Sequence, residues 1–258
     1  MDIGYIIAGL AVGFIVGLTG IGGGSLMTPI LLAFGISPAK AVGTDLLYAA
    51  ITKAGGVFVH HRRGNIDWRI TAWLSAGSVP AAALTLYGMH LLQPANAVLD
   101  GMIKHALGIA LLLTALAIIF KGPIARFTKQ HAGASSLLSP AGRNAATLIT
   151  GVFLGVLVTL SSIGAGALGT VALFLLFPLL PASRLVGTEI AHAVPLTLVA
   201  GLGHSTLGHI DWMLLLNLIG GSLPGIYLGS HLTGRIPDQA LRPIIAVMLA
   251  TVGARLAF

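Results

Sequence analysis

Eight long apolar blocks, separated by short polar stretches, make up nearly the whole chain. A helix that crosses a bilayer needs about 20 apolar residues, because each residue adds about 1.5 Å to its length. Charged residues make up 8% of the sequence, where a soluble chain carries roughly 25%. These features predict an all-α polytopic membrane protein. The blocks span residues 3–34, 39–59, 68–92, 99–120, 145–178, 184–202, 212–233 and 239–258.

Two of the blocks, 3–34 and 145–178, are too long for one straight helix across the membrane. Their 32 and 34 residues would extend about 48 Å or more, against a hydrocarbon core of about 30 Å. Both carry glycine near the middle, in the runs TGIGGGS at 19–25 and SSIGAG at 161–166. Glycine destabilises helix interiors, so each block is predicted to break there into two half-helices joined by an unwound turn.

The two halves of the chain carry the same motifs at an offset of 144 residues. The sequence Gly-Thr-Asp at 43–45 corresponds to Gly-Thr-Glu at 187–189, and Gly-x-Ile-Asp-Trp at 64–68 occurs again at 208–212. This similarity predicts an internal duplication. The predicted organisation is a first transmembrane repeat at 1–120, a cytoplasmic linker at 121–144 and a second transmembrane repeat at 145–258.

The side of the membrane on which each basic residue lies depends on whether the two broken blocks cross the membrane or turn back within it. If each block crosses the membrane once, the basic residues divide eight to five between the two sides. If each block is a re-entrant hairpin, they divide ten to three, with Lys53 left inside the membrane. The hairpin arrangement agrees better with the excess of Lys and Arg in cytoplasmic loops, and we favour it over single crossings. It gives each repeat three full crossings, so the repeats are inverted and both termini lie outside.

Charge and composition exclude several function classes. A net charge of +7 would suggest nucleic acid as the partner of a soluble protein, but here it follows from cytoplasmic loops, so no nucleic-acid partner is expected. The absence of cysteine excludes thiol catalysis, thiolate metal sites and disulfides. No nucleotide-binding context surrounds the glycine runs. The expected partners are the lipid bilayer and a small anionic substrate, without a cofactor.

The ordered, duplicated motifs resemble those of the TauE/SafE family of sulfite and organosulfonate exporters, and the similarity extends nearly end to end. The motifs are the glycine run followed by Pro29, the Val-Gly-Thr-Asp of 42–45 and the Gly-Asn-Ile-Asp-Trp turn of 64–68. The second copy carries Ala165 and Ala167 where glycine would be usual. The resemblance implies a bacterial inner-membrane permease for small sulfur-containing anions.

The two predicted unwound turns are candidate substrate sites. A glycine-rich turn exposes backbone N–H groups, and the half-helix that follows points its positive end at the gap, so an anion can bind there. The alternative is that these small residues only let helices pack closely. Lys53 either attracts the anion or extends to the basic face of the membrane. The candidate substrate-binding residues are Gly20, Gly22, Gly23, Gly24, Ser25, Ser161, Ser162, Gly164, Gly166 and Lys53.

Ionisable residues inside apolar helices are candidates for coupling transport to protons. Asp45 and its repeat equivalent Glu189 are each either a proton carrier or a structural partner of a lysine. His192 lies three residues after Glu189, on the same helix face, and is a third coupling candidate. One Glu-x-x-His pair without further carboxylates is a poor metal site, so no metal is expected.

Several polar residues are predicted at helix ends. Ser37 and Pro38 form a helix start, with the hydroxyl as the cap. The repeated Asp-Trp pairs of 67–68 and 211–212 predict a capping aspartate followed by an interfacial tryptophan. His204 belongs to a group of histidines that we expect to be solvated at helix ends.

The sequence therefore favours a secondary carrier over two rivals. The first rival is a passive anion channel, which would show no saturation and no competition between anions. The second is an intramembrane enzyme, for which Ser161 or Ser162 with His192 or His204 is the candidate set of nucleophile and base.

Overall fold

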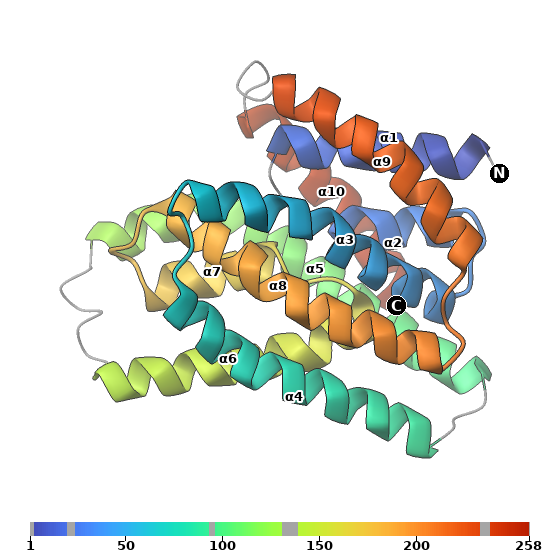
Figure 1. The fold of residues 1–258 in the computed structure, drawn as a ribbon, viewed down its shortest axis with the longest axis horizontal. Helices are drawn as coiled ribbons and strands as arrows, with labels where there is room; N and C mark the ends of the chain where they lie inside the picture. Colours follow the sequence, from blue (N-terminus) through green and yellow to red (C-terminus); the bar gives the residue numbers. More distant parts are fainter. Residues whose placement is uncertain (1–2, 20–23, 93–95, 131–138, 233–237, 258) are drawn as a thin grey trace.

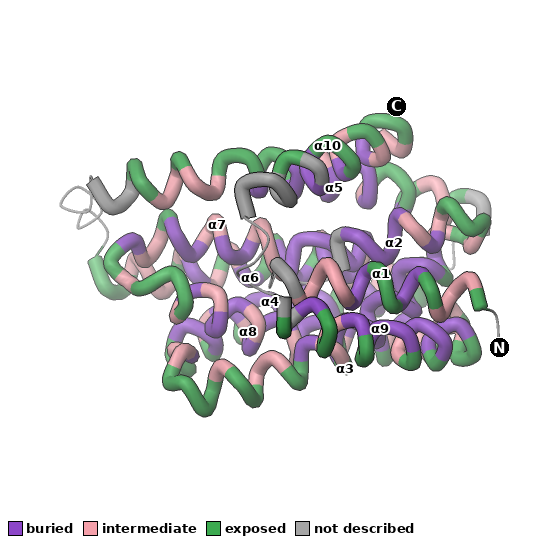
Figure 2. The backbone as a smooth tube through the Cα atoms, turned by 90° about the horizontal axis from the view of Figure 1, so that it is seen from above, coloured by how far each residue is buried: buried purple, intermediate pink, exposed green. Residues whose placement is uncertain are grey.

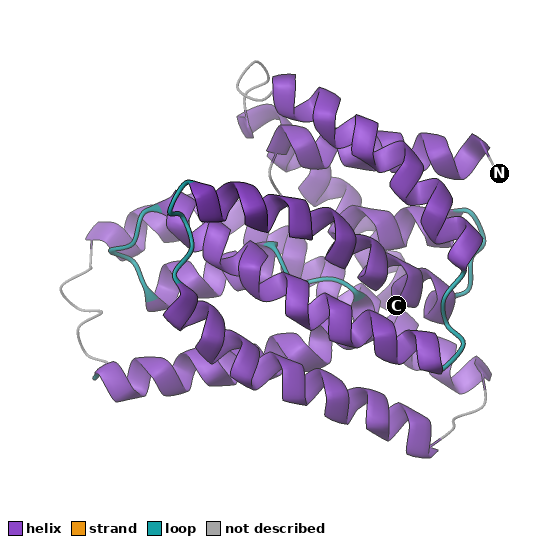
Figure 3. Cartoon of the chain, in the orientation of Figure 1, coloured by secondary structure: helices purple, strands orange, loops and turns teal. Residues whose placement is uncertain are grey.

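In the computed structural model, the described residues are 3–19, 24–92, 96–130, 139–232 and 238–257, and they form an all-helical bundle without a strand (Figures 1 and 3). The prediction of an all-α polytopic membrane protein is confirmed. The helices are α1 (Ile3–Thr19), α2 (Gly24–Ala33), α3 (Pro38–Arg62), α4 (Trp68–Leu92), α5 (Asn96–Gln130), α6 (Pro140–Ser161), α7 (Ala167–Leu176), α8 (Ala182–Thr206), α9 (Trp212–Leu232) and α10 (Asp238–Ala257).

The second overlong apolar block is split where its glycine run predicts it. There, α6 ends at Ser161, and Ser162 has the left-handed φ of 58°. Gly164 follows with a φ of 114°, a conformation that glycine adopts without the steric cost of a side chain. The unwound segment between α6 and α7 lies in the middle of the molecule (Figure 3). In the first block, α1 ends at Thr19 and α2 begins at Gly24, and the predicted break at 20–23 lies outside the described residues.

The two ends of each broken block lie close together. The ring of Tyr5, near the start of α1, lies 5.5 Å from the ring of Phe34, just beyond α2. The guanidinium of Arg143, near the start of α6, lies 5.8 Å from the ring of Phe177, just beyond α7. The two helices of each block therefore form a helical hairpin, with the two ends of the block side by side.

The helical hairpins pack on the opposite halves of the chain. Helix α1 lies along α9, and α6 lies along α4 (Figure 1). Glycines bring these backbones together: a Cβ on Gly13 would lie 2.7 Å from Ser222 Cα, and one on Gly155 would lie 2.9 Å from Ser78 Cα. Close backbone contact of this kind is typical of helix pairs in membranes.

The duplicated motifs hold α3 and α8 together as an antiparallel pair. The hydroxyl of Thr44 accepts a hydrogen bond from Asp211 N at 3.1 Å, and that of Thr188 accepts one from Asp67 N at 2.9 Å. Each Gly-Thr-acid motif thus binds the Asp-Trp turn of the other half. The neighbouring glycines make room for the turns, because a side chain there would collide with a backbone carbonyl.

The predicted helix starts are partly confirmed. Asp67 Oδ1 accepts hydrogen bonds from the N–H groups of Arg69 and Ile70, at 3.2 and 3.3 Å. Asp211 Oδ1 accepts one from Leu214 N at 2.9 Å. Helix α3 begins at Pro38 as predicted, but the Ser37 side chain makes no capping hydrogen bond.

Six described helices are long and apolar enough to cross a membrane: α3, α4, α5, α6, α8 and α9. Large apolar side chains remain exposed on the outer surface, including Leu84 and Ile149, as expected for contact with lipid. Buried residues lie on the inner sides of the helices (Figure 2). The predicted linker is partly helical, because α5 continues to Gln130 and α6 begins at Pro140.

Candidate functional site

Three charged side chains are buried in the centre of the bundle. Asp45 and Lys53 come from α3, and Glu189 comes from α8. Their exposed fractions are 0%, 7% and 1%. Buried charges are costly in a membrane protein unless they have partners or a function. Their surroundings therefore define the candidate site.

Lys53 reaches the unwound turn of the second repeat. Its Nζ donates a hydrogen bond to the backbone carbonyl of Ala165, between α6 and α7. The lysine therefore lies inside the bundle instead of extending toward the basic residues at the end of α3. Asp45 and Glu189 both lie close enough to act on it electrostatically, although neither forms an ion pair with it within 4.0 Å among the described residues.

Asp45 connects the two broken blocks. Its Oδ2 accepts a hydrogen bond from the hydroxyl of Thr28 in α2, at 2.5 Å. Ser162, in the second unwound turn, lies near the same carboxylate but forms no hydrogen bond with it. Within the described part of the chain, Asp45 Oδ1 and Ser162 Oγ have no hydrogen-bond partner. These two polar atoms are therefore available to a bound group.

Glu189 lies against the helix that follows the second turn. A Cβ on Gly169 of α7 would be only 2.7 Å from Glu189 Oε1, so glycine is required there for the carboxylate to fit. Glu189 Oε1 is buried and has no hydrogen-bond partner among the described residues. The carboxylates of the two halves thus each retain one free oxygen.

A polar contact beside the charged groups joins α8 to α4. The hydroxyl of Ser78 in α4 lies 2.8 Å from His192 Nε2. At the equivalent positions, Tyr48 lies near Ser222 in α9, but neither hydroxyl forms a hydrogen bond within the described residues. His192 therefore contacts α4, whereas Glu189 contacts α7. The two residues of the predicted Glu-x-x-His pair lie on one helix but contact different helices.

The second unwound turn has free backbone donors. The hydroxyl of Ser161 stabilises the turn, because it donates to Leu157 O at 2.6 Å and accepts from Ile163 N at 3.1 Å. None of the hydrogen bonds between described residues uses the N–H groups of Gly164, Ala165 or Gly166. Consecutive N–H groups of this kind form a site that suits an anion.

The first glycine run lies mostly outside the described residues. Gly20, Gly22 and Gly23 lie outside the described residues, so the structure gives no placement for these three candidates. Gly24 and Ser25 are the first two residues of α2.

Four site residues were missing from the candidates chosen by sequence: Thr28, Tyr48, Ser78 and Ser222. The offset of 144 residues relates Ser78 to Ser222 and Tyr48 to His192. Comparison of the two halves of the sequence could therefore have identified all of these residues except Thr28. The prediction of a solvated His204 is wrong. This residue is fully buried, and its Nε2 lies 2.9 Å from Thr159 O in α6.

The described residues contain no group of three or more potential metal ligands. His192 is bonded to Ser78, and His204 is bonded to Thr159 and His209. In the described part of the structure, neither histidine forms a hydrogen bond with Ser161 or Ser162.

Comparisons with known proteins agree with a transport role. The sequence model of the sulfite exporter TauE/SafE family matches residues 5–256. The chain is 41% identical to the probable membrane transporter protein YjnA of Bacillus subtilis, over 99% of this chain and 100% of that protein. It is 29% identical to YdhB of the same organism, over 95% and 96% of the two chains. It is 27% identical to MJ0441 of Methanocaldococcus jannaschii, over 96% and 92%. No solved structure matches the chain significantly.

Proposed function

The chain belongs to the TauE/SafE family of sulfite exporters, and on this basis we propose that it is a secondary transporter of small sulfur-containing anions. The family and the relatives indicate a membrane transporter rather than an enzyme, and the apolar helices indicate a multi-pass membrane protein. The proposed substrate is sulfite or an organosulfonate, as the description of the family suggests, and the proposed location is the bacterial inner membrane. An ion gradient or the substrate gradient supplies the energy.

The observation that supports this proposal most directly is the contact between Lys53 and the unwound turn. An ammonium group has three donors, and only one of them is engaged by Ala165 O. The free N–H groups at 164–166 and the hydroxyl of Ser162 lie around the same turn. A sulfur oxyanion placed there would receive charge-assisted hydrogen bonds, which are the stronger class.

Asp45 and Glu189 are the proposed proton carriers. Each is buried and retains one oxygen without a partner among the described residues. A proton bound there would neutralise the carboxylate next to Lys53 and leave the lysine free to bind the anion. Replacing the carrier, as Asp45→Asn or Glu189→Gln, should abolish uptake driven by a proton gradient while leaving exchange of anions intact. Equal loss of both activities would contradict a role in coupling.

We further propose that the two repeats are inverted and that alternating access moves one against the other. The antiparallel packing of α3 and α8, with matching contacts at both ends, supports this arrangement. Two sets of neighbouring basic residues also support it. Arg184, which forms an ion pair with Asp67, lies beside Arg69, and Lys104 lines the same pocket as Arg255. In each set, the hairpin path assigns both basic residues to the same side of the membrane.

The test is anion exchange in proteoliposomes that contain the purified protein. Labelled sulfite inside the vesicles should exchange saturably with external sulfite or organosulfonate, whereas a passive channel would show neither saturation nor competition. Lys53→Gln should weaken sulfite binding by about tenfold to a hundredfold, because it removes a charge-assisted hydrogen bond. Lys40→Gln, at an exposed position of the same helix, is the control. Unchanged exchange by Lys53→Gln would exclude the proposed site.

A further inference from the structure

A pocket of about 300 Å³ opens at the end of the α6–α7 hairpin, away from the unwound turn. Its volume is at the lower end of the range for pockets that bind small molecules, roughly 300–1,000 Å³. The lining combines apolar side chains, among them Trp73, Phe177 and Leu180, with the basic side chains of Arg69 and Arg143. The central site around Lys53, Asp45 and Glu189 does not include this pocket.

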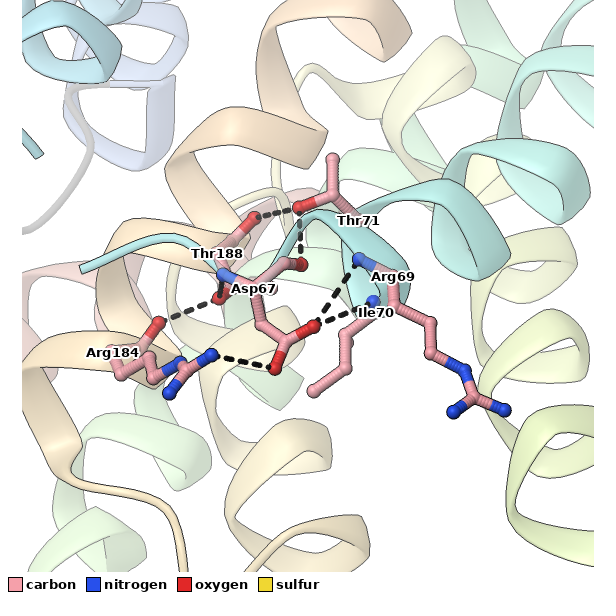
Figure 4. Close-up of polar contacts among 6 residues, drawn as sticks. All are labelled: Asp67, Arg69, Ile70, Thr71, Arg184 and Thr188. Carbon is pink, nitrogen blue, oxygen red and sulfur yellow. Dashed lines mark hydrogen bonds and ion pairs between the residues drawn. The ribbon is translucent and has the colours of Figure 1, made fainter. Parts of the chain in front are cut away.

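The charge of the pocket is uncompensated. Its one carboxylate, Asp67, forms an ion pair at 3.2 Å with Arg184 and caps α4 with its other oxygen (Figure 4). The guanidinium of Arg69 points away from that carboxylate (Figure 4). No ion pair among the described residues uses Arg69 or Arg143. The pocket therefore presents two positive groups without a neutralising partner.

One guanidinium nitrogen of the pocket lining is buried and has no hydrogen-bond partner. It is the Nε atom of Arg143, which forms no hydrogen bond within the described part of the chain. A buried donor without an acceptor costs about 1–3 kcal/mol, so a bound acceptor would relieve this cost. Planar guanidinium groups bind oxyanions well because they offer paired donors.

We propose that this pocket is a second anion site, which binds a small organic oxyanion with an apolar body. The head group lies between the guanidinium groups of Arg69 and Arg143. The apolar body lies against Trp73 and Phe177. A free organic anion and the head group of an anionic lipid share this chemistry, and both are considered in the test. The site does not depend on Lys53 and stands apart from the proposed transport function.

Tryptophan fluorescence measures occupancy of this pocket directly. The chain contains three tryptophans, and the double variant Trp68→Phe/Trp212→Phe leaves Trp73 as the single reporter. The probe is butanesulfonate, which does not absorb where tryptophan is excited. Butylammonium has the same apolar body with the opposite charge, and sulfate has the charge without the body. We expect a saturable change with butanesulfonate, a much weaker one with sulfate and none with butylammonium.

Variants separate this site from general attraction of anions and from the central site. In the reporter background, Arg143→Gln should weaken butanesulfonate binding about tenfold or more. Arg69→Gln tests the same site at an exposed side chain whose loss does not endanger folding, and it should weaken binding severalfold. Arg63→Gln, outside the pocket lining, and Lys53→Gln, in the central site, should leave the affinity unchanged.

The source of the ligand is distinguished in nanodiscs. The two lipids are compared at high salt, which screens the charge of the bilayer surface. If phosphatidylglycerol still raises the apparent Kd of butanesulfonate relative to phosphatidylcholine, a lipid head group occupies the pocket; an equal Kd assigns it to free anions. A response that survives both Arg143→Gln and Arg69→Gln would overturn the proposal. A response that disappears in Lys53→Gln would also overturn it, because the reporter would then be sensing the central site.

Discussion

Helices α3 and α8 occupy equivalent places in the two halves but carry different chemistry. The contacts that join them are the same in both: Thr44 binds the turn at Asp211, and Thr188 binds the turn at Asp67. The side chains that face the centre are not the same. Where α3 has Lys53, α8 has Thr197, whose hydroxyl bonds to its own helix at Ala193 O.

Matching contacts between α3 and α8 therefore coexist with different central side chains. Lys53, in the first half, reaches the unwound turn of the second half, whereas the equivalent Thr197 carries no charge. The carboxylates Asp45 and Glu189 are present in both halves, but one is bonded to Thr28 and the other lies against Gly169. Substitutions at equivalent positions can test which contacts the two halves have in common and which they do not.

The largest loss of stability is expected at the two equivalent glycines that lie against a turn of the other half. Gly43→Leu and Gly187→Leu would each drive a side chain into a backbone carbonyl, of His209 and of Asn65 respectively. Each should lower the free energy of unfolding by about 3 kcal/mol or more, measured by thermal unfolding in detergent. Gly88→Leu, where no atom lies within 4 Å of the new Cβ among the described residues, is the control. If only one of the two substitutions is tolerated, the two halves do not pack in the same way at these glycines.

The next effect tests the asymmetry of the centre. Lys53→Thr should reduce sulfite affinity by about tenfold to a hundredfold. Adding Thr197→Lys should not restore it, because Ala165 and Ser162 belong to the second half alone. The measurement is binding of sulfite by isothermal titration. Recovery of affinity in the double variant would mean that the two halves are interchangeable.

A smaller effect distinguishes the two flanking serines. Ser78→Ala leaves the buried His192 Nε2 without its partner, which should cost about 1–3 kcal/mol of stability. Ser222→Ala should cost less, because Ser222 Oγ makes no hydrogen bond within the described residues. Thermal unfolding of the two variants in the same detergent compares them directly. Equal losses would argue against a distinct role for His192.

The smallest effect concerns the two capping aspartates. Asp67→Ala and Asp211→Ala should each cost about 1 kcal/mol through the lost helix cap. Asp67→Ala should cost up to about 1 kcal/mol more, because it also removes the partly exposed ion pair with Arg184. Arg184→Gln in the Asp211→Ala background separates the two contributions. If Arg184→Gln has no effect in any background, the ion pair contributes no stability.

The sequence predicted features that depend on neighbouring residues. The glycine run at 161–166 located the break between α6 and α7, and Asp67 and Asp211 were recognisable caps because the preference of aspartate before a helix is local. The end of α5 was misplaced, because residues 121–130 are polar enough to resemble a loop. They continue as helix because each added residue extends an existing ladder of hydrogen bonds.

Contacts between distant residues could not be predicted in this way. Nothing near Lys53 in the sequence indicates that it bonds to Ala165, which lies in the other half. The burial of His204 follows likewise from its contact with Thr159 in α6. The inverted orientation of the repeats was derived from the charge of the loops, and it stays a proposal.

The packing of α1 on α9, and of α6 on α4, has a consequence for biogenesis. When α1 leaves the ribosome, the surface that receives it has not yet been synthesised, because α9 begins at Trp212. The face of α1 that carries the glycines must therefore contact lipid or an insertion factor until nearly the whole chain is made. Neither half can complete its own core, so a chain that stops after the first repeat would leave α1 and α4 without their partners.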